Sequence, residues 1–143
     1  MRFWDSSAIV PILVLEEQSA WAQDLLRDDP IGIVWALSPV EVHSALVRRR
    51  RDGSLAARDF TAARSRAKIV FAAMAQVVVL EQVAERALRV LDLHPLRAAD
   101  ALQLAAALLA SRERPQDLPF VTLDERLAEA AEREGFLLVS PQA

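Results

Sequence analysis

Few folds suit the way this chain begins, with a very short apolar run, three polar residues and then a helix-length apolar stretch. Phe3 and Trp4 form the run, Asp5-Ser6-Ser7 closes it, and apolar residues resume at Ala8. This order predicts a strand, a polar turn and a helix that begins near Ser7. Because ligands of open α/β sheets bind outside the carboxyl ends of the strands, Asp5 is well placed for chemistry.

The alternation of strands and helices continues to the end of the chain. Four more strands are predicted, at Ile31–Leu37, Val77–Leu80, Phe120–Thr122 and Phe136–Val139. Helices are predicted at Ser38–Arg51, Leu55–Ala75, Glu81–Leu93, Ala98–Ala110 and Asp124–Glu134. This alternation predicts an α/β fold, a three-layer α/β/α sandwich in which right-handed crossover helices cover both faces of a parallel sheet.

Local signals mark the ends of the helices. Ser38-Pro39-Val40-Glu41 is typical of a capping box, with serine at the N-cap, proline at N1 and glutamate at N3. Ser19 is the expected N-cap of a further short helix, which Asp28-Asp29-Pro30 ends. Gly135 is the expected stop of the last helix.

Length and composition indicate one globular domain, residues 1–143. A chain of 143 residues buries roughly two-thirds of its unfolded surface in one core. Its 53% hydrophobic content excludes a disordered chain, and polar residues interrupt each apolar stretch before it reaches membrane-spanning length. Because cysteine is absent and Asp5 interrupts any secretory leader, we expect a cytoplasmic protein without membrane contact, disulfides or thiolate metal site.

The net charge of −3 hides a basic segment at residues 48–68. This segment carries eight basic residues against two acids, a net charge of +6. The basic residues are Arg48, Arg49, Arg50, Arg51, Arg58, Arg64, Arg66 and Lys68. A basic flank on an otherwise acidic protein suits a polyanionic partner, since clustered Arg can contact phosphates. A solvated helix face is the structural alternative.

Four acids lie where a parallel sheet would bring them together. Asp5 ends the first strand, Glu41 and Asp124 lie just past the second and fourth, and Asp100 is in the first turns of the helix preceding the fourth. These positions share one edge of the sheet. Each acid also has a structural alternative: Asp5 and Asp124 as N-caps, Glu41 in the capping box, and Asp100 as complement to a helix N-terminus.

Asp100 is the acid that its structural alternative explains least well. It lies on an otherwise apolar helix, where an ionised carboxylate must meet a cation, a donor or solvent. Arg97, three residues earlier, is one possible partner. A divalent cation would instead neutralise several converging acids, and oxygen ligands without His or Cys favour Mg²⁺ or Mn²⁺ over zinc.

Two hydroxyls and two histidines complete the polar candidates. Ser7 lies two residues after Asp5, and Thr122 lies two residues before Asp124. Each hydroxyl is close enough to orient a carboxylate or a water, or to form a local cap. For His43 and His94 we expect surface or packing roles.

Together the acidic motifs resemble those of PIN-domain ribonucleases. The motifs are Asp5-Ser6-Ser7-Ala8, Ser38-Pro39-Val40-Glu41, Leu96-Arg97-Ala98-Ala99-Asp100-Ala101-Leu102 and Val121-Thr122-Leu123-Asp124. Size, motif order and the two basic helices look most similar to the VapC toxins of bacterial type II toxin–antitoxin modules. The resemblance covers essentially the whole chain. One departure is Gln103, at a position where relatives often have histidine.

The resemblance implies a five-stranded parallel sheet in the order 3-2-1-4-5 and endonucleolytic cleavage of RNA with Mg²⁺ or Mn²⁺. Carried over by motif, Asp5, Glu41, Asp100 and Asp124 become the catalytic, metal-binding quartet, with Ser7 and Thr122 as supporting polar groups. Because the acidic edge would repel RNA, we expect Arg48, Arg49, Arg50 and Arg51 to supply phosphate contacts. A homodimer and a VapB-type antitoxin are also implied.

Other functions are weighed against this one. A PIN nuclease of RNA processing or turnover that is no toxin, and a non-catalytic α/β binding domain, both stay open. A receiver domain would need an Asp at the end of the third strand and a later lysine, whereas that strand ends at Leu80-Glu81 and the only lysine is Lys68. A haloacid-type phosphatase would need a second Asp at position 7, which is Ser7.

Overall fold

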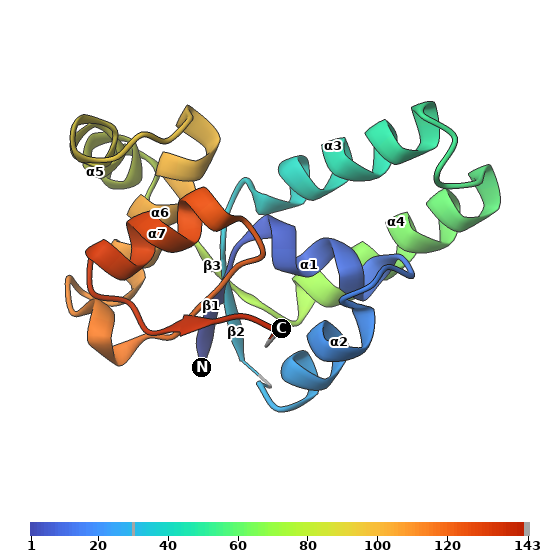
Figure 1. The fold of residues 1–143 in the computed structure, drawn as a ribbon, viewed down its shortest axis with the longest axis horizontal. Coiled ribbons are helices and arrows are strands. Elements are labelled where there is room, and N and C mark those ends of the chain that lie inside the picture. The colour runs from blue at the N-terminus through green and yellow to red at the C-terminus, as the bar shows by residue number, and fades with distance from the viewer. Residues whose placement is uncertain (30, 142–143) are drawn as a thin grey trace.

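The computed structural model describes residues 1–29 and 31–141, and Figure 1 shows its arrangement. The elements in chain order are β1 (Arg2–Trp4), α1 (Ser6–Leu13), α2 (Ser19–Arg27), β2 (Gly32–Trp35), α3 (Ser38–Arg51), α4 (Ala57–Ala72), β3 (Ala75–Val77), α5 (Leu80–Leu93), α6 (Ala98–Ala110), a 3₁₀ turn (Pro115–Asp117), β4 (Phe120–Val121), α7 (Glu125–Arg133) and β5 (Leu138–Val139). The predicted α/β alternation is confirmed.

All strand pairs in the sheet are parallel, and the order is β3-β2-β1-β4-β5, as predicted. The first strand is therefore central, with Phe3 paired to Ile33 on one side and to Phe120 on the other. The strand order reverses beside β1, which is the switch point where open α/β sheets form their binding crevice. The end of β1, and hence Asp5, lies at this point.

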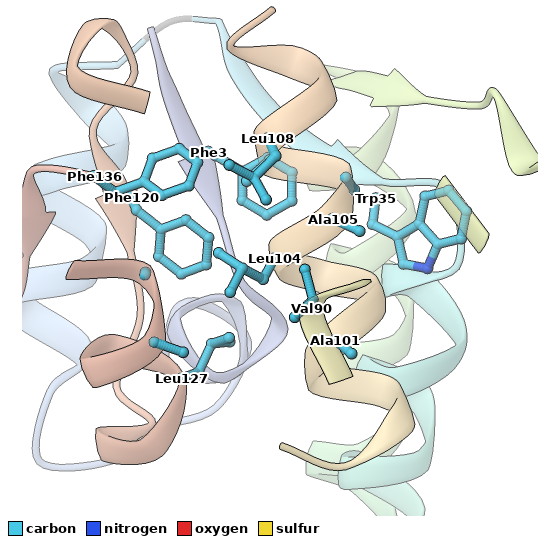
Figure 2. Packing of buried hydrophobic residues seen from close by; sticks show 14 of the residues in the cluster. Phe3, Trp35, Val90, Ala101, Leu104, Ala105, Leu108, Phe120, Leu127 and Phe136 are labelled. Atoms are coloured by element: carbon cyan, nitrogen blue, oxygen red, sulfur yellow. The ribbon is translucent and has the colours of Figure 1, made fainter. Parts of the chain in front are cut away.

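Side chains of alternate strand residues pack into two separate hydrophobic cores, one on each face of the sheet. Phe3 and Phe120 point to the face covered by α5, α6 and α7, whereas Trp4 and Val121 point to the face covered by α1 to α4. On the first face the rings of Phe3 and Phe120 stack with their centroids 5.4 Å apart, and Leu104 of α6 packs beside them (Figure 2). The three-layer sandwich is confirmed.

Helices α3 and α4 form an arm, defined here as residues 38–72, that projects from the body of the molecule (Figure 1). The two helices pack along each other through Leu46, Phe60 and Ala63, all of which are buried. The guanidinium of Arg50 lies 4.1 Å from the centre of the Phe60 ring and adds a cation–π contact between the helices. The basic segment thus covers much of this arm.

The third strand begins and ends earlier than the sequence indicated, and the helix before it, α4, ends at Ala72 and not at the predicted Ala75. We predicted a strand at Val77–Leu80, but β3 is Ala75–Val77 and α5 already begins at Leu80. The reason is pairing: Ala75 lies opposite Ile33 and Val77 opposite Trp35, where β2 ends, so Val78 has no partner strand. The exposed valines that follow made the apolar run look like part of the strand.

Two predicted N-caps are wrong. Ser38 and Ser19 are the first residues of α3 and α2, and Leu37 and Gln18 occupy the cap positions without side-chain hydrogen bonds. Ser19 instead donates to the Val14 carbonyl at 2.8 Å and so fixes the turn between α1 and α2. Gly135, with φ +104°, follows α7 as predicted. The predicted helix-ending residue Pro30 lies outside the described residues.

Within residues 1–29 and 31–141, no helix combines the length and apolar character that crossing a membrane requires.

Candidate active site

One groove of about 780 Å³ lies at the carboxyl edge of the sheet, and all four predicted acids line it. Asp5 follows β1, Glu41 lies in the first turn of α3, Asp100 in the first turn of α6, and Asp124 caps α7. The predicted convergence of these residues is therefore present. The two histidines lie away from it, His43 on the arm and His94 beside Glu134.

Asp5 is the most deeply placed of the acids, with 4% of its surface exposed. Its Oδ2 accepts hydrogen bonds from the Ser7 hydroxyl at 2.6 Å, the Thr122 hydroxyl at 2.9 Å and the Ser7 amide at 3.3 Å. Among the described residues, no donor contacts Oδ1. One carboxylate oxygen is thus fixed by the protein, and the other is available to a ligand.

The two hydroxyls that hold Asp5 also connect it to the loop after β4. The Leu123 amide donates to Ser7 Oγ at 2.9 Å, and the Asp124 amide donates to Thr122 Oγ1 at 3.0 Å. Asp124 Oδ1 in turn accepts from the Leu127 amide and caps α7. The cap roles weighed for Asp5 and Asp124 are therefore real, and they coexist with a place in the groove.

Burial and mutual repulsion disfavour the ionised forms of Asp5, Glu41 and Asp100. Burial raises the pKa of Asp5 to about 6, although the Ser7 and Thr122 hydroxyls oppose the shift. The pKa of Asp100 is also raised to about 6, first by burial and then by the charges of Asp124 and Asp5. The pKa of Glu41 is raised by burial, and the charge of Asp100 adds to this. The groove therefore favours a positive ligand.

The Glu41 carboxylate is held by Gln103 of helix α6 and not by a capping box at the start of α3. Gln103 Nε2 on α6 donates to Glu41 Oε2 at 3.0 Å, and the Ser6 hydroxyl also helps to lower the pKa of Glu41 against burial. The capping-box interpretation of Glu41 fails because this carboxylate is turned toward α6, and Ser38 accepts from the same amide at 3.1 Å.

Among the described residues, no basic side chain pairs with Asp100. Arg97 and Arg126 lower its pKa only as the weakest of the influences on it. Within the described residues, none of the four groove acids forms an ion pair with a basic side chain. The alternative in which Arg97 pairs directly with Asp100 is thus not supported.

Comparison with known proteins agrees with this arrangement. The profile of the PIN domain family matches residues 2–133. The chain belongs to the PIN domain family. No curated protein sequence matches it.

Solved structures with the same fold span almost the whole of this PIN domain. A toxin–antitoxin complex from Klebsiella pneumoniae is 16% identical over 99% of this chain and 98% of its own, with a TM-score of 0.66. VapC20 of Mycobacterium tuberculosis, a sarcin–ricin loop cleaving toxin, is 20% identical over 99% of this chain and 100% of its own, also at 0.66. FitAcB from Neisseria gonorrhoeae is 17% identical over 98% and 97%, at 0.64.

PIN domains are nucleases that generally use divalent metal ions, and the groove residues fit such an ion. The donors are oxygens only, their charges repel each other, and Asp5 Oδ1 is left for a ligand. Within residues 1–29 and 31–141, no three His, Asp or Glu side chains form a ready-made metal cage.

The four arginines proposed for phosphate contacts have different surroundings. Arg48 is exposed and lines the groove. Arg49 also lines it but forms an ion pair with Glu16 at 2.6 Å, while Arg50 lies over Phe60. Arg51 ends α3 and is exposed. Arg48 and Arg51 are therefore the less constrained members of the group.

Sequence reasoning missed the polar residues that hold Glu41. Gln103, Ser6 and Ser38 form a buried cluster behind the groove, in which Gln103 Nε2 lies 2.9 Å from Ser6 Oγ and 3.1 Å from Ser38 Oγ. A signal existed, because Gln103 and Asp100 are the only polar residues of α6 and stand three apart, on the same face. The polar stripe of an apolar helix marks the side that meets other polar groups.

Proposed function

We propose that this PIN domain is a cytoplasmic endoribonuclease that depends on Mg²⁺ or Mn²⁺ and acts as the toxin of a type II toxin–antitoxin module. The observation that carries the proposal is the gathering of Asp5, Glu41, Asp100 and Asp124 in one groove without a basic partner among the described residues. Such a groove binds poorly to a polyanion unless a cation is present. A metal-dependent phosphodiesterase meets this requirement.

In this proposal Asp5 and Asp100 are the principal metal ligands, and Glu41 and Asp124 complete the acidic set. A bound Mg²⁺ or Mn²⁺ would lower the pKa of a water and offset the negative charge on the phosphoryl and leaving-group oxygens in the transition state. Ser7 and Thr122 keep the Asp5 carboxylate in one rotamer through their hydroxyls, so that Oδ1 faces the ligand. The protein thus supplies a fixed array of oxygens.

RNA is the proposed substrate because the fold is shared with VapC20, a sarcin–ricin loop cleaving toxin. The phosphates of such a strand need positive charge near the acids. Arg48 and Arg49 on α3 and Arg97 before α6 all line the groove, so a strand crossing the acids would pass basic side chains at both α3 and α6. We expect Arg48 and Arg51 to contribute most on the arm.

The antitoxin proposal rests on the similarity to toxin–antitoxin structures and on a surface of the arm. A largely apolar groove of about 570 Å³ lies between α3 and α4, with Leu46 and Phe71 in its lining and Arg64 and Lys68 beside them. An amphipathic segment with acidic flanks would match it. Arg64→Glu with Lys68→Glu should weaken binding of the antitoxin and leave RNA cleavage intact.

We also propose a homodimer, and α5 offers the surface for it. Leu80 and Leu88 are each 60% or more exposed and share one side of the helix with Leu91, and Val78 just before the helix is 66% exposed. Exposed apolar patches of this kind mark protein interfaces. Sedimentation of the wild type at dimer mass, and of Leu88→Glu at monomer mass, is the expected result; a monomeric wild type would exclude the dimer.

The deciding experiment is cleavage of total cellular RNA by the purified protein with Mn²⁺ or Mg²⁺. Asp5→Asn and Asp100→Asn variants and an EDTA sample accompany the wild type, and Asp92→Asn, an exposed acid on α5, is the matched control. We expect discrete cuts with the wild type and the control, and none with EDTA or the groove variants. Circular dichroism of each variant checks that it is folded.

Other outcomes would change the proposal in defined ways. Cleavage that persists in EDTA would contradict metal dependence, and cleavage by Asp5→Asn would remove that residue from the site. A folded wild type that binds Mn²⁺ but cuts no RNA would refute the endoribonuclease and favour a binding domain. The product of a small adjacent gene should suppress growth inhibition when it is coexpressed with this protein. If it does not, a PIN nuclease of RNA processing is favoured over a toxin.

A further inference from the structure

Among residues 1–29 and 31–141, Gln103 is the only side-chain amide that is fully buried, and it lies directly behind the groove. Its Nε2 is 2.9 Å from Ser6 Oγ, 3.1 Å from Ser38 Oγ and 3.0 Å from Glu41 Oε2. An amide nitrogen has two N–H donors, so these three oxygens compete for them. One N–H goes to the carboxylate, since donation to a charged acceptor is the stronger bond.

The other end of the same amide has no partner. Gln103 Oε1 is buried and accepts no hydrogen bond from any described residue. Turning the amide over would offer this oxygen to the two serine hydroxyls, which can donate, but it would also place it against the Glu41 carboxylate. The orientation present is therefore set by the needs of Glu41 and leaves a buried acceptor unsatisfied.

The three oxygens bound by Gln103 belong to segments that carry groove acids. Ser6 directly follows Asp5, Ser38 opens α3 three residues before Glu41, and Gln103 itself is three residues after Asp100. The amide thus connects the starts of α1, α3 and α6 behind the acids. Because the site lies at the junction of these helices, their relative placement decides where the carboxylates stand.

We infer that Gln103 is a positioning residue, which holds the Glu41 carboxylate in the orientation needed for cation binding without touching cation or substrate. The inference rests on the proposed metal-dependent function. Groups that orient metal ligands in this way change metal affinity or activity by about 10–100-fold when they are replaced. Gln103 has the place and the donor for this role.

Gln103→Met is the variant that separates positioning from simple packing. Methionine has nearly the same length and shape, but it removes both the donor to Glu41 and the unsatisfied Oε1. If Gln103 had only a structural role, Gln103→Met should lower the melting temperature in EDTA. A positioning residue would instead show about a 10-fold or greater loss in Mn²⁺ affinity by calorimetry and in kcat, with KM for RNA unchanged.

Two further variants test the donor itself. Gln103→His retains a ring N–H at a similar distance and should recover Mn²⁺ affinity to within about threefold, as expected for a retained hydrogen bond. In a Glu41→Gln background, Gln103→Met should have no further effect on Mn²⁺ affinity, because a residue that acts only through Glu41 is silent without that carboxylate.

Ser111→Ala is the matched control for a buried polar change near the same helix. Ser111 caps the C-terminus of α6 and donates only to the Leu108 carbonyl, at 2.8 Å. This variant should leave Mn²⁺ affinity and kcat at wild-type values. A loss of Mn²⁺ affinity equal to that of Gln103→Met would show that any disturbance of α6 has the same effect, and would overturn the inference.

The remaining outcomes distinguish the inference from the proposed function. A wild type that binds no Mn²⁺ would refute the proposed function and, with it, the basis of the inference. A wild type that binds Mn²⁺ beside an equally competent Gln103→Met would refute the inference alone. If Gln103→Met does not fold, Gln103→Asn, whose shorter amide withdraws from Glu41, replaces it; failure of both to fold would make Gln103 a structural residue and contradict positioning.

Discussion

Replacing Asp5 by Asn should stabilise the protein at neutral pH while it abolishes the proposed activity. Asp5 is buried, and its pKa of about 6 lies well above the ordinary value of 3.8. At about 1.4 kcal/mol per pKa unit, keeping this carboxylate ionised costs about 3 kcal/mol of folding free energy at pH 7.5. Asparagine can keep its carbonyl oxygen where Ser7 and Thr122 donate, without the charge.

The pH dependence of this effect has a definite sign. Since the pKa of Asp5 is higher in the folded state than in the unfolded state, the folded state binds more protons between pH 3.8 and 6. The free energy of unfolding of the wild type therefore falls as pH rises through this window and stays low above it. The Asp5→Asn variant lacks this fall. Its advantage over the wild type should grow from about 1 kcal/mol at pH 4.5 to about 3 kcal/mol at pH 7.5.

Urea denaturation in EDTA at these two pH values measures the difference. Comparison of wild type and variant at each pH cancels the contributions of all other titrating groups, and Asp92→Asn, an exposed acid, should show no difference at either pH. An Asp5→Asn variant that is no more stable than the wild type at pH 7.5 would refute the reasoning. So would an advantage of equal size at both pH values.

Three further results are expected. Mn²⁺ affinity should fall between pH 7.5 and 5.5, because Asp5 and Asp100 have pKa values of about 6 and must lose their protons to bind the ion. The fall should be up to about 10-fold per pH unit for each proton displaced. An affinity that calorimetry finds constant over this range would contradict the prediction. Arg48→Ala should weaken RNA binding and reduce the slope of log affinity against log salt by about 1, as fluorescence anisotropy can measure. Arg49→Ala should also lower the melting temperature, because it breaks the ion pair with Glu16; thermal melts test this. Leu104→Ala should cost about 2–5 kcal/mol of unfolding free energy in urea, since Leu104 is fully buried against Phe3 and Phe120.

The groove acids could be located from the sequence because topology alone places them. Asp5 comes directly after β1 and Asp124 lies three residues after β4, and the ends of parallel strands meet at one edge of the sheet. Their neighbours in space are fixed by the strand order, which the resemblance to PIN-domain ribonucleases implied and the structure confirms. Ser7 and Thr122 follow the same rule, since each lies within two residues of an acid it supports.

The contacts that the sequence did not predict join side chains that are far apart in the chain, and they depend on the direction in which each side chain points. Glu41 fits a capping box by spacing, yet its carboxylate turns to Gln103, which is 62 residues away. Arg49 is one of four consecutive arginines, and only the packing of α3 against the α1–α2 turn pairs it with Glu16. The end of β3 was misplaced for a related reason, because its length is set by its partner strand β2.

The same burial that makes the groove costly for the fold makes it suitable for a cation. Asp5 and Asp100 are held partly or wholly out of water and repel each other, so each ionised carboxylate destabilises the protein in the absence of a counter-charge. A divalent cation that binds only the folded state removes this penalty and stabilises the fold by mass action. Stability and cation binding are thus coupled through the same carboxylates, so that variants which relieve the repulsion should fold better and bind the cation less well.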